Sequence, residues 1–183
     1  MKLPFAFAGV LLLLASGCKK NDLDPDGLVP ATQAGENTGD FLLNGRPYRP
    51  GRDSAYPGPA VSAGWYKIWG GRQITVTMGR QFDRDDTVLN IVLPRLTGPG
   101  AFTITDGVSP VVIAGNRPYV LYSAIHPSPA RRFLTRPTAV GRVELTRYDT
   151  VARVVSGTFE ATLREYQGPD SVVITKGRFD CKF

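Results

Sequence analysis

The chain has 183 residues, of which 42% are hydrophobic and 21% are charged, and its formal net charge is +6. This composition is typical of a globular protein and excludes a disordered or fibrous chain; after an N-terminal leader, the length allows one domain of roughly 140 residues. A basic chain suits nucleic acid inside a cell, but the leader described next indicates export, so we expect no nucleic-acid partner. Scattered arginines that solubilise strand faces are the simpler explanation of the charge.

Residues 1–18 have the form of a secretory signal. Lys2 precedes an apolar run over residues 3–15, which is shorter than the ~20 residues that cross a bilayer as a helix. The run ends in Ala-Ser-Gly followed by Cys18, which resembles the lipobox of bacterial lipoproteins. That resemblance implies that residues 1–17 are a cleaved signal peptide and that Cys18 carries the lipid. The expected location is the outer membrane, on its periplasmic or cell-surface face, with the lipid as the membrane contact.

Residues 18–40 are predicted to be a lipid-attached flexible tether. They are rich in Asn, Asp, Pro, Gly and Thr and show no apolar periodicity, and a flexible coil of this length spans roughly 25 Å. The Asp-x-Asp-x-Asp-Gly run at 22–27 opens like a calcium loop, but Gln33 stands where the closing glutamate is needed. Acidic residues close behind the lipid-bearing cysteine instead resemble the signal that exports Bacteroidota lipoproteins to the cell surface.

Residues 41–183 are predicted to form a single all-β domain, an antiparallel β-sandwich or a flattened β-barrel. Asn44-Gly45 predicts a tight hairpin between two short strands, and Pro47 places the second of them at a sheet edge. No window shows a helical stripe. The strands are expected at residues 41–43, 46–48, 61–69, 72–82, 87–93, 101–105, 111–114, 119–124, 138–148, 151–165, 171–175 and 177–183.

The chain has two cysteines, Cys18 and Cys181. If Cys18 carries lipid, Cys181 has no intrachain partner and no disulfide framework exists. Strand alternation places Cys181 on one face with Phe179 and Phe183, which favours a small buried hydrophobic residue. The alternatives are a reactive thiol, or a disulfide between the two cysteines in an unlipidated secreted form.

Catalytic and metal-binding patterns are weak, so we expect no enzyme, no cofactor and no metal. His126 is the only histidine, lies in a predicted loop and has no Gly-x-Ser-x-Gly elbow to serve. The aspartates at 83–86 favour a turn over a cation site. Carboxylate pairs for glycoside hydrolysis need no sequence motif, so a hydrolase with unrecognised carboxylates remains a third hypothesis.

Trp65, Lys67 and Trp69 would share one face of a strand. Exposed aromatic rings on a sheet face stack on sugars, and the lysine would add polar contacts. This pattern favours a glycan-binding accessory protein as the alternative function. Both tryptophans could instead fill the core.

Arg131 and Arg132, with Arg136 and Arg142 further along, form the densest basic stretch. Guanidinium groups bind carboxylate and phosphate bidentately, so a spatial cluster would suit an anionic glycan or another anionic envelope component such as a lipid headgroup. A solvated sheet edge that discourages aggregation is the other interpretation.

Two stretches bracket the mature chain: PATQ-x-G-x-NT at 30–38 with Asn44-Gly45, and GTFE at 157–160 with IT-x-GRFD at 174–180. They are similar to segments of a family of uncharacterised Bacteroidota lipoproteins. Members often have an aromatic residue after the Asn-Thr pair, where this chain has Gly39-Asp40. The resemblance implies a secreted, lipid-anchored, all-β domain and no particular activity. We therefore expect a non-enzymatic envelope domain with a binding or structural role.

Overall fold

The computed structural model describes residues 23–55, 57–68, 71–82, 85–105, 117–126 and 128–183. The signal peptide, Cys18, Trp69 and the strand predicted at 111–114 lie outside these residues. Within them every regular element is a strand, which confirms the all-β prediction. The same residues contain no helix with the length and apolarity needed to cross a membrane.

The strands agree with the expected pattern over most of the chain. They are β1 (Thr38–Leu43), β2 (Arg46–Tyr48), β3 (Gly51–Arg52), β4 (Val61–Ile68), β5 (Gly71–Phe82), β6 (Asp85–Pro94), β7 (Gly100–Ile104), β8 (Tyr119–Ala124), β9 (Arg131–Leu134), β10 (Gly141–Asp149), β11 (Val154–Glu165) and β12 (Ser171–Lys182).

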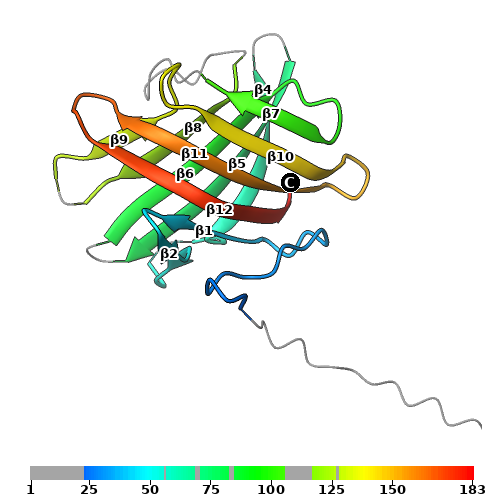
Figure 1. The fold of residues 1–183 in the computed structure, drawn as a ribbon. Coiled ribbons are helices and arrows are strands. Elements are labelled where there is room, and N and C mark those ends of the chain that lie inside the picture. Colours follow the sequence, from blue (N-terminus) through cyan, green and yellow to red (C-terminus); the bar gives the residue numbers. More distant parts are fainter. Residues whose placement is uncertain (1–22, 56, 69–70, 83–84, 106–116, 127) are drawn as a thin grey trace, which may run out of the picture.

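One sheet curls into an open half-barrel (Figure 1). Its strand order is β2-β1-β12-β11-β9-β8-β6-β5-β3, while β4 pairs with β5, and β10 joins β11 to β7. All pairs are antiparallel except β3 with β5. The structure therefore shows an all-β fold built on one curled, open sheet, where the expectation was either a sandwich or a flattened barrel.

The concave face of the sheet holds the core. Along β5 the side chains of Ile74, Val76 and Met78 point inward and are almost fully buried, and β11 shows the predicted alternation of buried and exposed residues. Cys181 is fully buried, as predicted, and burial raises the pKa of its thiol to about 12. Such a thiol stays protonated at neutral pH, which argues against a reactive role.

Three local features differ from the prediction, and the first is the two-residue strand β3, which forms where no strand was expected. The second is strand β9, which forms where no strand was predicted. Its residues pair with β8 and β11, and this pairing cannot be seen in the local sequence pattern. The two strands predicted around Lys176 are one strand, β12. A β-bulge there shifts the register, and Lys176 takes a positive φ of 52°, so the chain bends without breaking the ladder.

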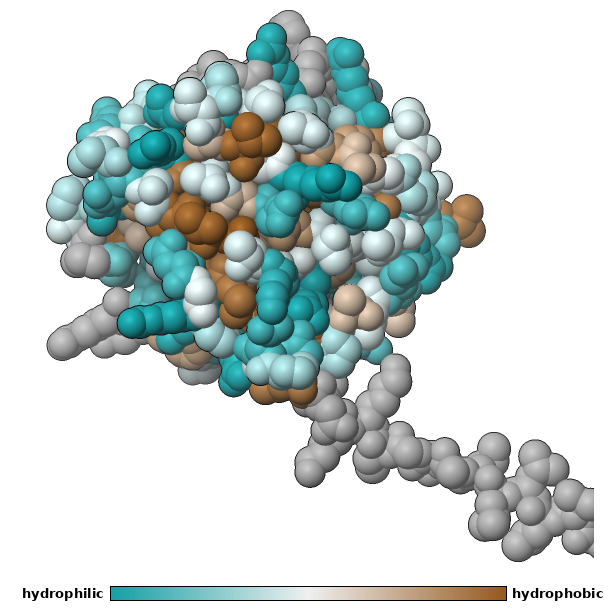
Figure 2. All heavy atoms as spheres, in the orientation of Figure 1, coloured by the Kyte–Doolittle hydropathy of each residue, from teal (hydrophilic) through white to brown (hydrophobic). Residues whose placement is uncertain are grey.

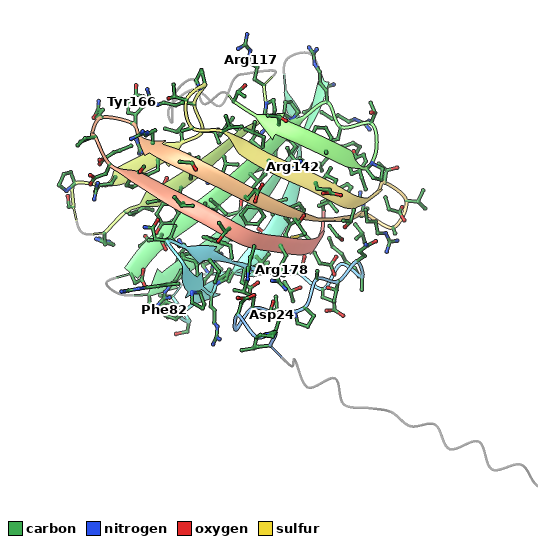
Figure 3. The ribbon with its side chains drawn as sticks, in the orientation of Figure 1. Asp24, Phe82, Arg117, Arg142, Tyr166 and Arg178 are labelled. Atoms are coloured by element: carbon green, nitrogen blue, oxygen red, sulfur yellow. The ribbon has the colours of Figure 1, made fainter. Side chains whose placement is uncertain are left out.

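The N-terminal segment, residues 24–37, corrects the prediction of a flexible tether over residues 18–40. It lies along β1 and β12 below the half-barrel in Figure 1, and β1 already begins at Thr38. Leu28 is fully buried. Arg178 of β12 donates to Asp24 Oδ2 at 2.8 Å and to the Val29 carbonyl at 2.9 Å (Figure 3). The absence of apolar periodicity misled the prediction, because polar contacts hold most of this segment.

Asp180 is the main polar anchor of the N-terminal segment. Its carboxylate is 1% exposed and accepts hydrogen bonds from Thr32 Oγ1, from Ser156 Oγ and from the backbone N–H groups of Ala34, Gly35 and Glu36. Burial alone would raise the pKa of Asp180, but these hydrogen bonds outweigh it and hold the pKa below the ordinary value. The N-terminal segment is therefore fixed to the sheet by a buried anion.

Candidate functional site

A pocket of about 540 Å³ opens at one end of the half-barrel, between the β1–β2 hairpin and the strands β5, β6 and β8. We call it the hairpin-end pocket. This volume lies in the range of small-molecule sites. Its lining residues are Leu43, Asn44, Arg46, Pro47, Tyr48, Arg80, Asp85, Thr87 and Tyr122.

The sequence fixes the position of the hairpin wall. Asn44 and Gly45 take φ values of 50° and 77°, so the predicted two-residue turn is present and reverses the chain between β1 and β2. The Asn44 side chain accepts a hydrogen bond from the Val173 backbone N–H at 2.8 Å, and the Asn44 N–H donates back to the Val173 carbonyl. These two bonds tie the turn to β12 and hold the pocket wall in place.

Three hydroxyl groups meet in the pocket. Tyr48 Oη lies 2.9 Å from Thr87 Oγ1 and donates to the Thr87 carbonyl at 3.2 Å. Burial raises the pKa of Tyr48 and of Tyr122, and the Thr87 side chain offsets part of each rise. Both phenols are therefore neutral at physiological pH, and the Tyr48 proton is already shared with Thr87.

Aromatic packing holds these two tyrosines in position. The Tyr48 ring stacks on Phe41 with centroids 4.4 Å apart, and the edge of Tyr48 meets Tyr122 at 6.3 Å. Tyr48 is 5% and Tyr122 6% exposed, so both rings belong to the core, and the contacts between the Tyr48 hydroxyl and Thr87 are themselves buried. A polar group that is already fixed on a rigid strand loses little conformational entropy when a ligand binds.

Charged groups sit at the pocket rim. Arg80 Nε and Asp85 Oδ2 form an ion pair at 2.5 Å, with both side chains about 40% exposed. Arg46 is exposed and forms no ion pair with the residues that the structure describes. The lining thus carries two guanidinium groups against one carboxylate and is net basic. Asp85 belongs to the predicted acidic turn; Asp83 lies outside the described residues.

The opposite end of the half-barrel carries Trp65 and Lys67. Trp65 is 39% exposed, and the Arg72 guanidinium lies over its ring at 4.0 Å while Phe183 meets it edge-on at 6.1 Å. The Trp65 ring is therefore neither buried in the core nor fully open to a ligand. Lys67 is exposed beside it, and Trp69 is outside the described residues.

The predicted basic patch does not form one cluster. Arg131 is bound bidentately by Glu165 at 2.7 and 2.9 Å and also contacts Asp170, and these hydrogen bonds raise the pKa of Arg131. Arg132 is exposed on the same strand, whereas Arg142 lies on β10 near Glu144. Strand β9 pairs with β8 from Arg131 to Leu134, but its ladder with β11 covers only Phe133 and Leu134, so Arg131 and Arg132 lie beyond the residues that pair on both sides.

The convex face of β10, β11 and β12 is a mixed polar and apolar surface (Figure 2). A shallow groove of about 450 Å³ runs over it, bounded by Ala31 of the N-terminal segment and containing Glu144 and Glu160. Arg142, also in this groove, is labelled in Figure 3. Both glutamates are exposed, so water surrounds them and no dry environment separates an acid from a base.

Two aspartates of the acidic run at 22–27, Asp24 and Asp26, have structural partners, and Asp22 lies outside the described residues. Asp24 accepts hydrogen bonds from the backbone N–H groups of Asp26 and Leu28, and the Leu28 bond together with Arg178 lowers the pKa of Asp24. Asp26 pairs with Lys176 at 2.7 Å. Among the described residues no group of three or more His, Cys, Asp or Glu side chains is arranged to hold a metal ion.

Comparisons with protein-family models, with curated proteins and with solved structures return no match for this chain. The hairpin-end pocket was not predicted, because its walls come from two hairpins and strand β8, which are far apart from one another in the chain. The sequence contained one indication of this pocket, namely the two turn signals at 44–45 and at 83–86. They mark the two hairpins that meet at this end, but their meeting follows only from the curl of the sheet.

Proposed function

We propose that the chain is a lipid-anchored domain of the cell envelope that binds a small polar molecule in the hairpin-end pocket without transforming it. The pocket is the observation that carries the binding role, because it joins a volume of about 540 Å³ to fixed hydroxyl groups and an ion pair. The anchor rests on Cys18 and the small residues before it, which resemble a lipobox. The outer membrane, on either face, is the proposed location.

The docked N-terminal segment limits the distance between anchor and domain. Six residue steps separate Cys18 from Asp24, the first residue of the N-terminal segment, so this stretch spans at most roughly 20 Å in any conformation. By the same fully extended measure, a free tether reaching to residue 40 would allow at most roughly 75 Å. A lipid on Cys18 would thus hold the half-barrel close to the bilayer surface.

Glycan binding through exposed aromatics is the second candidate. It is supported by the 39% exposure of Trp65 beside the exposed Lys67. Arg72 covers one face of the indole, so a sugar would have to displace that guanidinium or use the other face. The hairpin-end pocket is an existing depression of about 540 Å³, and we therefore place it first.

A hydrolase built on unrecognised carboxylates is the third candidate. The convex groove supports it only by bringing Glu144 and Glu160 into one depression. The pair lacks the burial that would keep one carboxyl protonated as a general acid. We therefore propose a binding role rather than an enzymatic one.

Replacing Cys18 with alanine tests the anchor. Cells fed an alkyne palmitate are expected to label the wild-type chain and to give no label on Cys18→Ala, which should also leave the membrane fraction. Cys181→Ala is the matched control: Cys181 is the other cysteine, it is buried, and its removal should leave labelling unchanged. Equal labelling of wild type and Cys18→Ala would overturn the lipid-anchor proposal.

A further inference from the structure

The chemistry of the hairpin-end pocket indicates a class of ligand, an inference that rests on the binding role proposed above. Tyr48, Thr87 and Tyr122, each with a hydroxyl group, line the pocket, and the Tyr48 and Thr87 hydroxyls are hydrogen-bonded to each other, so a ligand would have to share or replace that bond. A ligand that matches them must itself mix donors and acceptors at close spacing. Polyhydroxylated molecules such as sugars have this property, because every hydroxyl is both a donor and an acceptor.

The ion pair at the rim adds to this match. Arg80 Nε and Asp85 Oδ2 lie 2.5 Å apart, so donor and acceptor groups stand side by side. Neighbouring hydroxyls of a sugar ring can accept from the guanidinium and donate to the carboxylate at the same time. Both side chains are about 40% exposed, but Arg80 Nε itself is buried, so a ligand would meet other polar atoms of the pair.

The net charge of the pocket lining distinguishes between neutral and charged sugars. The pocket lining carries Arg46 and Arg80 against Asp85, an excess of one positive charge. Arg46 is exposed, lies at the start of β2 beside the fixed Asn44-Gly45 turn, and has no ion-pair partner among the residues described. A guanidinium in this position can bind a carboxylate bidentately.

We propose that the hairpin-end pocket binds an acidic sugar. Its ring hydroxyls contact the Tyr48–Thr87–Tyr122 hydroxyl groups and the Arg80–Asp85 pair, and its carboxylate is bound by Arg46. The ligand is bound reversibly and no bond is made or broken.

Calorimetric titration of the full chain, kept in a sugar-free non-ionic detergent, tests this assignment with glucuronate and with glucose. Glucuronate should bind saturably and at least about tenfold more tightly than glucose, the difference that one charge-assisted contact supplies. Arg46→Gln should weaken glucuronate about tenfold and leave glucose unchanged. Tyr122→Phe should weaken both, with an unchanged urea midpoint showing that the variant is folded.

Arg142→Gln is the matched control, because it removes one exposed guanidinium on the convex face of β10. It should bind glucuronate like the wild type. The assignment is overturned if neither sugar binds saturably, or if Arg46→Gln and Arg142→Gln weaken glucuronate equally. Equal binding of glucose and glucuronate that Tyr122→Phe weakens would also overturn the acidic class, while leaving the proposed binding function standing.

Discussion

Replacing Asp180 with alanine should lower the free energy of unfolding by about 3 kcal/mol. The carboxylate is 1% exposed and accepts five hydrogen bonds, so its removal leaves Ser156 without its partner and detaches the segment containing Ala34, Gly35 and Glu36. Urea unfolding measures the loss. Amide hydrogen exchange at residues 34–36 should accelerate more than exchange in the core strand β5.

Two comparisons make the Asp180 prediction specific. Asp180→Asn keeps one acceptor oxygen and should lose about half as much stability. The stabilising contribution is present above the ordinary aspartate pKa of about 3.9 and is lost as pH falls through the lowered pKa of Asp180, because protonation removes the anion that the donors need. The gap between wild type and Asp180→Ala should therefore close in acid. A gap that stays constant down to pH 2 would contradict a role for the charge.

Replacing Gly157 with alanine should also destabilise the domain by about 3 kcal/mol, the upper end for overpacking a core. A Cβ at this position would lie 2.4 Å from the backbone oxygen of Glu144 on the neighbouring strand β10 and 3.1 Å from the Phe179 ring. Neither the paired strand nor the buried ring can move away without disturbing the ladder. Thermal or urea unfolding measures the effect.

Gly98→Ala is the matched control for Gly157→Ala. A Cβ at Gly98 meets nothing within 4 Å and Gly98 has no positive φ, so the change should stay within about 0.5 kcal/mol of wild type. If both variants have equal stability, the close packing of β10 on β11 would be refuted.

The sequence pattern predicted most strands because their signals are local. The Asn44-Gly45 turn, the alternation along β11 and the burial of Cys181 each depend on a few neighbouring residues. Strand β9 was not predicted because a strand of four residues has too little sequence pattern of its own. Its pairing with Tyr122, about ten residues away, and with Glu165, more than thirty residues away, becomes visible only in the structure.

The docking of residues 24–37 escaped prediction for a different reason. The prediction of a flexible tether rested on the lack of apolar residues to bury in this segment. Within the segment only Leu28 is an apolar residue that is completely buried. The contacts that hold it are made to Asp180 and Arg178, which lie about 150 positions away. A single sequence does not reveal such pairs of polar residues, because any aspartate or arginine in a strand could equally face water.

The candidate site was the least predictable part. Trp65, Lys67, Arg131 and Arg132 were singled out by residue type, and the structure places the tryptophan and the Arg131 guanidinium in contacts with other side chains. The hairpin-end pocket depends instead on residues that read as ordinary strand and turn positions. Their convergence is a property of the curled sheet.

Hydrogen exchange of the full, membrane-anchored chain with and without glucuronate tests the central claim most directly, because it distinguishes the three candidate surfaces. We predict added protection at residues 44–48, 80–82 and 85–87, the segments that carry the lining residues of the hairpin-end pocket. Protection confined to residues 65–67 at the opposite end, or to the convex face around 142–144 and 158–160, would contradict the account.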